Sequence, residues 1–204
     1  MGKPRGLIFG VGINDSDYVT SKRVDGKNIV CPFYRSWVSM FLRSYSKQLH
    51  DIRPTYIGCS VAKEWHSFMA FRSWMVVQDW KEKQLDKDIL HAGNKVYSPE
   101  KCVFIPRKLN SLLCDSATTR GDLPMGVSSD RSYFQSRVSK DGKQKTLGVS
   151  KTPMQAHAIW QKAKALLIEQ AANEQTDERI KNALIQRVKQ LRDDLANGRE
   201  TIKL

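Results

Sequence analysis

Acidic, imidazole and amide side chains gather in one short stretch of the chain, between positions 85 and 110. The stretch contains Asp86, Asp88, His91, Asn94 and Asn110. Carboxylate and amide oxygens are ligands that hard divalent cations prefer, and a histidine can take up a proton near neutral pH. Residues of these types could therefore hold a metal ion against a phosphodiester bond and activate the water that attacks it.

Two short apolar runs flank these side chains and predict the elements that position them. The runs lie at 85–90 and 102–105, and the Gly93-Asn94 pair between them is typical of a hairpin turn because both residues tolerate positive φ. Pro106 then precedes leucines at helical spacing, and a proline fits the first turn of a helix. The stretch therefore predicts strand, loop, strand, helix.

This order, with Asp86 on the first strand and Asn110 on the helix, resembles the ββα-metal unit of HNH endonucleases of the phage and mobile-element homing type. The resemblance implies that Asp86 and Asn110 hold one divalent cation, Mg²⁺ or Mn²⁺. Two helical patterns upstream resemble the lead-in of the same proteins. Their matching residues are Trp37, Met40, Arg43, Tyr45, Glu64, Trp65, Phe68, Phe71, Trp74 and Met75.

Lys87 stands where that family has its general-base histidine. An ammonium group that is protonated near neutral pH takes no proton, so either the pKa of Lys87 is lowered or another group, Asp88 or His91, acts as the base. The family's central asparagine is replaced as well: Cys102 stands near its place, and Asn94 could tie the loop instead. The alternative without catalysis is a strand-turn-strand whose charges are solvated.

The composition favours a cytoplasmic DNA-binding protein. The 204 residues carry a net charge of +13, which favours polyanions and, without a lipid-anchor signal, nucleic acid first. No apolar run approaches the roughly 20 residues that span a bilayer, and the N-terminus lacks a signal-peptide pattern. The four cysteines form no CxxC spacing, so free thiols are favoured over structural zinc.

We predict an α+β fold made of four segments. An N-terminal arm at 1–31 has a turn at Asp25-Gly26, and its GVGIND sequence lacks the ending of a phosphate-binding loop. The HNH-like catalytic domain with its helical lead-in occupies 32–115, a DNA-binding domain 123–172, and a C-terminal helix 176–204. A polar linker is expected at 114–122.

The segment at 123–172 predicts three short strands and then an alanine-rich helix that opens at Thr152-Pro153. It resembles the plant Apetala-type (ethylene-response-factor-like) DNA-binding domain, whose sheet lies in the major groove. If Phe134, Ser136 and Val138 face the helix, Gln135 and Arg137 face outward. Arginine and glutamine suit bidentate contacts with guanine and adenine edges.

Basic residues cluster around the expected hairpins of this sheet. They are Arg131, Lys140, Lys143, Lys145 and Lys151. Such side chains bind phosphates and set position more than sequence. After an expected N-cap at Thr176, apolar residues from Ile180 to Leu195 recur at helical spacing, and this helix either docks on its own chain or pairs two copies in a homodimer.

These features together predict a site-specific DNA endonuclease that nicks or cuts double-stranded DNA. The rival is a non-catalytic DNA-binding protein, a repressor or replication-interfering factor, that kept the scaffold and lost the base. A third reading, an RNA-directed binder, is disfavoured because the deep major groove of RNA excludes side chains.

Overall fold

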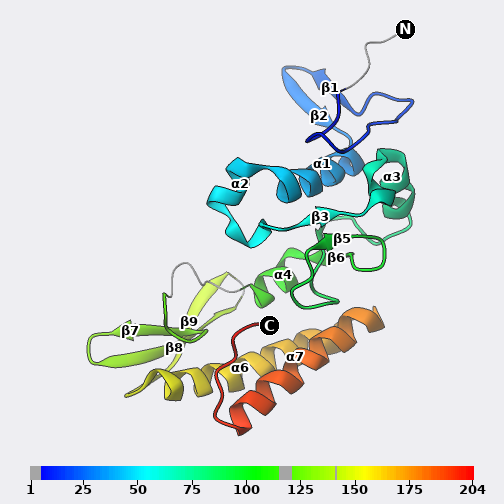
Figure 1. The fold of residues 1–204 in the computed structure, drawn as a ribbon. Helices are drawn as coiled ribbons and strands as arrows, with labels where there is room; N and C mark the ends of the chain where they lie inside the picture. Colours follow the sequence, from blue (N-terminus) through cyan, green and yellow to red (C-terminus); the bar gives the residue numbers. More distant parts are fainter. Residues whose placement is uncertain (1–5, 115–120, 141) are drawn as a thin grey trace. The chain divides into compact units, whose positions relative to one another are not determined.

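The protein, seen here in a computed structural model, combines helices with small sheets, which confirms the α+β class (Figure 1). The structure describes residues 6–114, 121–140 and 142–204. It divides into two compact units, Met1–Ile105 and Pro106–Leu204. The expected linker at 114–122 falls largely outside the described residues. Among the helices that are described, none is long and apolar enough to cross a membrane.

An aromatic core holds the first unit together. Helix α1 (Pro32–Tyr45) starts with its proline in the first turn and buries Trp37, Met40 and Phe41 completely. The ring of Trp37 lies 5.5 Å from that of Phe68, and its indole N–H donates to the carbonyl of Trp65 at 2.8 Å. The aromatic stripe is therefore core, as its spacing predicts.

The second apolar stripe is two elements rather than one helix. A 3₁₀ turn, η2 (Lys63–His66), ends at Ser67, and α3 (Phe68–Val76) begins there. The Ser67 hydroxyl accepts the N–H of Ala70 at 3.0 Å, and this capping bond breaks the helical run. The unit's remaining short elements before the candidate site are α2 (Lys47–Ile52), η1 (Pro54–Tyr56) and β3 (Ser60–Val61).

Strands β4 (Lys83–Asp86) and β6 (Val103–Pro106) pair, and α4 (Arg107–Leu113) follows β6 directly. The predicted order of elements is present, with two corrections. The first strand ends at Asp86 rather than at position 90, because the Asp86 carboxylate accepts the next backbone N–H groups and bends the chain. The Gly93 turn does not join the two strands either, since β5 (Val96–Tyr97) intervenes and pairs in parallel with β3.

A two-stranded hairpin lies at the end of the N-terminal arm. Strands β1 (Ser21–Val24) and β2 (Lys27–Val30) are antiparallel. The turn between them has positive φ at both central residues, 50° at Asp25 and 76° at Gly26. This is the turn that the Asp-Gly pair predicts.

The second unit contains a three-stranded antiparallel sheet in the order β7 (Val127–Asp130), β8 (Tyr133–Lys140) and β9 (Lys143–Ser150). Helix α6 (Pro153–Asn173) follows and packs on it. The predicted cap is confirmed, since the Thr152 side chain accepts the N–H of Gln155 at 3.3 Å. The predicted inward face of β8 is confirmed at Ser136 and Val138, which are buried, whereas Phe134, Gln135 and Arg137 are half-buried.

The C-terminal helix α7 (Glu178–Ala196) packs on α6 within the same chain, in the helical pair that Figure 1 shows. Its N-cap is Asp177 rather than the expected Thr176, because the Asp177 carboxylate accepts the N–H of Arg179 at 2.9 Å. After α7 the chain returns to α6, where the N–H of Thr201 donates to Nε2 of the buried His157 at 3.0 Å. Of the two alternatives for this helix, the structure contains the intrachain one.

Candidate functional site

Asp86 is the last residue of β4 and is only 9% exposed. Its Oδ1 accepts the backbone N–H groups of Asp88 at 3.0 Å and Ile89 at 2.7 Å. Burial and the neighbouring Asp88 carboxylate oppose ionisation and raise the pKa of Asp86 to about 6, although the two backbone bonds act in the opposite direction. This carboxyl group is therefore held rigidly, and positive charge nearby would favour its ionised form.

Lys87 points inward from the next position and is 6% exposed. Its ammonium donates to the Asp88 carboxylate at 3.0 Å and lies 6.0 Å from the centre of the Tyr97 ring. This ion pair suits Lys87 to holding negative charge.

Asn94 braces the loop after β4. Its Nδ2 donates to the carbonyls of Lys87 at 2.6 Å and Val96 at 2.7 Å, and its Oδ1 accepts the N–H of Val96 at 3.2 Å. The loop between Asp86 and β5 is thus closed by one amide side chain. His91 is exposed within this loop, in a turn where its carbonyl accepts the N–H of Asn94 at 3.0 Å.

Arg43 and Tyr97 belong to the same neighbourhood, although the sequence did not mark them as site residues. The Arg43 guanidinium, from α1, lies 5.2 Å from the centre of the buried Tyr97 ring and donates to the carbonyl of Leu85 at 3.4 Å. A second cation therefore lies against the ring that Lys87 approaches. The only sequence signal for Arg43 is its place in the helical lead-in.

Cys102 stays a thiol in this surrounding. It is 1% exposed, and burial raises its pKa to about 12, with a smaller contribution from the Asp86 carboxylate. A buried thiol with its pKa raised in this way is a poor nucleophile near neutral pH. Cys102 therefore contributes packing next to Asp86 and Asp88, which we call the acidic pair.

Asn110 lies in the second unit, in the helix α4 that follows β6. Its Oδ1 accepts from the Cys114 thiol at 4.0 Å. Asp86 belongs to the first unit, and the two units are described each by itself. That Asp86 and Asn110 share one metal ion therefore stays a prediction. Over residues 6–114, 121–140 and 142–204, no group of three or more His, Cys, Asp or Glu side chains is arranged to hold a metal.

The predicted reading residues form a connected row on the outer face of the second unit's sheet. Arg137 donates to Oε1 of Gln135 from Nη2 at 2.7 Å and from Nε at 3.1 Å. Gln135 in turn donates to the Asp130 carboxylate. Both Gln135 and Arg137 are half-buried, so their side chains are ordered before any ligand arrives.

The expected phosphate contacts lie at the two turns of this sheet. Arg131 is exposed in the turn between β7 and β8, with a φ of 52° in the left-handed region that few non-glycine residues adopt. Lys143 and Lys145 are exposed on β9. The side chain of Lys140 lies outside the described residues.

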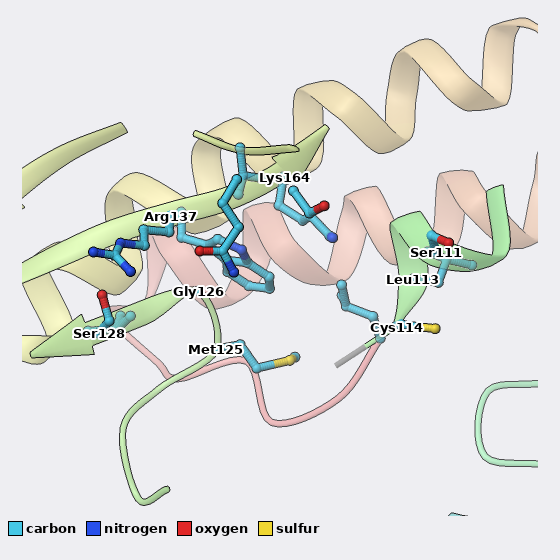
Figure 2. A pocket seen from close by; sticks show the side chains of 14 residues that line it. Ser111, Leu113, Cys114, Met125, Gly126, Ser128, Arg137 and Lys164 are labelled. Carbon is cyan, nitrogen blue, oxygen red and sulfur yellow. The ribbon is translucent and has the colours of Figure 1, made fainter. Parts of the chain in front are cut away.

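A pocket of about 300 Å³ lies in the second unit, with Arg137, Lys164, Gly126 and Cys114 among its lining residues. In Figure 2 the Arg137 guanidinium points away from Lys164. The Lys164 ammonium donates to the carbonyl of Leu112. Since the volume is at the lower limit for small-molecule sites, we assign no ligand to this pocket.

Comparisons of the chain with models of protein families, with curated proteins and with solved structures find no match.

Proposed function

We propose that the chain is a site-specific endonuclease that hydrolyses phosphodiester bonds of double-stranded DNA with a divalent cation. The observation that carries this proposal is the buried Asp86 beside Asp88 at the end of β4, in a loop that Asn94 ties to β5. The order strand, loop, strand, helix supports it, as does a net charge of +13. Acidic groups held rigidly on an otherwise basic protein are what metal-assisted cleavage of a polyanion requires.

The chemistry of Asp86 fits a divalent cation. Its ionisation is opposed by burial and by Asp88, and a bound cation would offset both. Asp86, with Asn110 as the amide ligand, would hold Mg²⁺ or Mn²⁺, which supplies charge stabilisation at the scissile phosphate.

The chain's own side chains divide the remaining work. We assign His91, which is exposed in the loop, to take the proton from the attacking water. Lys87 and Arg43, both against Tyr97, would neutralise charge on the phosphate. Asn94 is a positioning residue, because it contacts only the loop backbone in the bonds described above.

Target choice falls to the sheet of the second unit in this proposal. The half-buried Arg137 and Gln135 would contact base edges in the major groove, while Arg131, Lys143 and Lys145 would contact phosphates. The ordered Asp130–Gln135–Arg137 row supports this division, since side chains fixed in advance lose less conformational entropy on binding.

One observation favours a non-catalytic DNA-binding protein as the second candidate. Lys87 occupies the position of the family's general base, and its ammonium is engaged with Asp88. A repressor that kept the scaffold and lost its base would have this arrangement. Pairing of two copies through α7 is not needed by either candidate, because the apolar face of α7 packs on α6.

The decisive experiment incubates the protein with supercoiled plasmid that carries the DNA flanking its own coding sequence, with Mg²⁺ or with EDTA. We expect nicked or linear product with Mg²⁺ only, and none with Asp86→Ala. Asp51→Ala, which changes an exposed aspartate of the same unit, is the matched control and should cleave normally. Sequence-specific binding without cleavage under Mg²⁺ and Mn²⁺ would select the repressor, and full activity of Asp86→Ala would exclude the proposed site.

The general base is tested by the pH dependence of the cleavage rate. A limb with an apparent pKa of about 6 to 7 that disappears in His91→Ala supports His91 as the base. Because Asp86 titrates in the same range, the profile is measured at two Mg²⁺ concentrations. A limb from Asp86 moves to lower pH as Mg²⁺ rises, whereas one from His91 does not. Loss of an alkaline limb in Lys87→Ala, with His91→Ala unchanged, would make Lys87 the base.

A further inference from the structure

The β1–β2 hairpin is a ribbon whose strands pair only with each other within the described part of the chain. Seven of its eight strand residues are exposed, the exception being the half-buried Val30. The ribbon joins the first unit at its base, where the N–H of Cys31 donates to the carbonyl of the buried Thr20 at 2.8 Å. A lone two-stranded hairpin is marginally stable in water. Such a ribbon gains stability from a partner that covers it.

The charge of the ribbon indicates which kind of partner would bind it. Lys22, Arg23 and Lys27 are basic, and Asp25 in the turn is the single acidic residue between positions 21 and 30. All three basic side chains are exposed. A surface with this balance complements a polyanion.

The register sorts the ribbon into two chemically different faces. Directly opposed residues of an antiparallel pair share a face, so Arg23 lies beside Asn28. The Ser21 hydroxyl donates to Oδ1 of Asn28 at 2.6 Å and fixes its amide. Arginine and asparagine are the side chains that make bidentate contacts with guanine and adenine. This face therefore carries groups suited to base edges.

The other face carries one lysine on each strand. Lys22 lies opposite Ile29, and Lys27 lies opposite Val24. Long lysine side chains on the two strands can reach both phosphate walls of a groove that contains the ribbon. The major groove, about 12 Å wide, admits a two-stranded ribbon of this kind.

We propose that the β1–β2 ribbon is a second DNA contact, which enters the major groove with Arg23 and Asn28 toward the base edges and with Lys22 and Lys27 toward the phosphates. The inference rests on the proposed function only in taking duplex DNA as the ligand. It adds a sequence-reading element to the unit that carries the acidic pair. With strands of four residues, the ribbon covers about 4 base pairs, since both a strand residue and a base-pair step rise about 3.4 Å.

The test compares variants of the full chain on a duplex obtained by binding-site selection with the wild type. The first variant, Lys22→Ala/Lys27→Ala, should lower the slope of log affinity against log salt by about 2, since each phosphate contact contributes about 0.9. The matched control, Lys189→Ala/Lys203→Ala, removes two exposed lysines of the second unit and should keep the wild-type slope. The changed residues are exposed, so both proteins should retain the wild-type circular dichroism.

The second variant, Arg23→Lys, separates reading from charge. It keeps the positive charge and loses the bidentate contact, so the salt slope should stay and affinity for the selected site should fall about tenfold or more. Guanine-N7 methylation should cease to interfere at one position within the roughly 4 base pairs under the ribbon.

The outcomes separate this inference from the proposed function. Unchanged slope in Lys22→Ala/Lys27→Ala, an equal change in the control, or methylation interference that is the same in Arg23→Lys overturns the ribbon contact and leaves a DNA-binding protein. If selection with the wild type yields no bound duplex, both the ribbon contact and the proposed function are overturned.

Discussion

Replacing Asp86 by asparagine should stabilise the protein at neutral pH while it abolishes cleavage. The pKa of Asp86 rises from 3.8 to about 6 on folding, first through burial and then through Asp88. A carboxyl with a raised pKa binds protons more tightly in the folded state, so its stabilising contribution is complete below the unfolded pKa and is lost as pH rises through the folded pKa. Wild-type stability should therefore fall between about pH 4 and pH 6 through this group.

The size of the effect follows from the same values. One pKa unit corresponds to about 1.4 kcal/mol, so a rise from 3.8 to about 6 amounts to roughly 3 kcal/mol at pH 7. Asp86→Asn keeps the Oδ1 that accepts the N–H groups of Asp88 and Ile89, removes the charge, and replaces the second carboxylate oxygen by an NH2 donor. We therefore expect it to raise the free energy of unfolding by about 2–3 kcal/mol at pH 7 and by little at pH 4.

Urea unfolding at pH 4, 5, 6 and 7 measures this difference, with the fluorescence of the tryptophans packed in the first unit as the signal. Asp51→Asn is the matched control, because it removes an exposed carboxylate of the same unit. Mg²⁺ should stabilise the wild type at pH 7 and stabilise Asp86→Asn much less. The reasoning is refuted if the stabilities of wild type and Asp86→Asn run parallel from pH 4 to 7.

Three further substitutions test the loop, the second unit's core and the reading face. Asn94→Ala removes three hydrogen bonds of the loop and should cost about 2–3 kcal/mol in urea unfolding; an unchanged midpoint would contradict the brace. Gly126→Ala adds a Cβ 1.9 Å from the Trp160 ring at a φ of 73°, so it should lower Tm by more than 10 °C, equivalent to about 3 kcal/mol or more. Arg137→Ala should relax sequence preference by about 1–3 kcal/mol, whereas Lys143→Ala should weaken all duplexes alike; an unaltered selected motif in Arg137→Ala would count against the sheet as reader.

Features that depend on neighbouring residues could be predicted from the sequence. The Asp25-Gly26 turn, the proline at the start of α1 and the Thr152 cap of α6 each follow from one or two residues and their backbone preferences. The buried face of β8 follows from alternation alone, as Ser136 and Val138 confirm.

The predicted bounds of helices and strands were wrong where a polar side chain hydrogen-bonds to the backbone and interrupts the element that the apolar spacing predicts. The stripe that ends at Met75 has helical spacing throughout, but the Ser67 hydroxyl caps α3 and ends the turn before it. The run that begins at Leu85 is apolar enough for a longer strand, but Asp86 takes the N–H groups of the next residues. The spacing of apolar residues does not predict such hydrogen bonds, because each bond depends on a single polar side chain.

Contacts between residues distant in sequence could not be predicted at all. The approach of Arg43 to Tyr97 joins α1 to β5, and the parallel pairing of β3 with β5 joins Ser60 to Val96. Neither leaves a local signal, so a cation that lies near the acidic pair went unrecognised as a site residue. The Asn94 brace was foreseeable only because its partners are close in sequence.

The distribution of charge bears on the choice between nuclease and repressor. Residues 1–105 contain sixteen basic and ten acidic side chains, and residues 106–204 contain eighteen and eleven. A repressor needs its basic excess on the unit that reads DNA, because affinity rises with the number of phosphates contacted there. A nuclease must in addition bring the phosphate backbone to the unit that carries its acidic pair, against the repulsion of those carboxylates. The nearly equal excess on the two units meets the requirement of the proposed nuclease, but it equally suits a repressor that contacts DNA with both the second unit's sheet and the β1–β2 ribbon, so the cleavage assay decides between the two candidates.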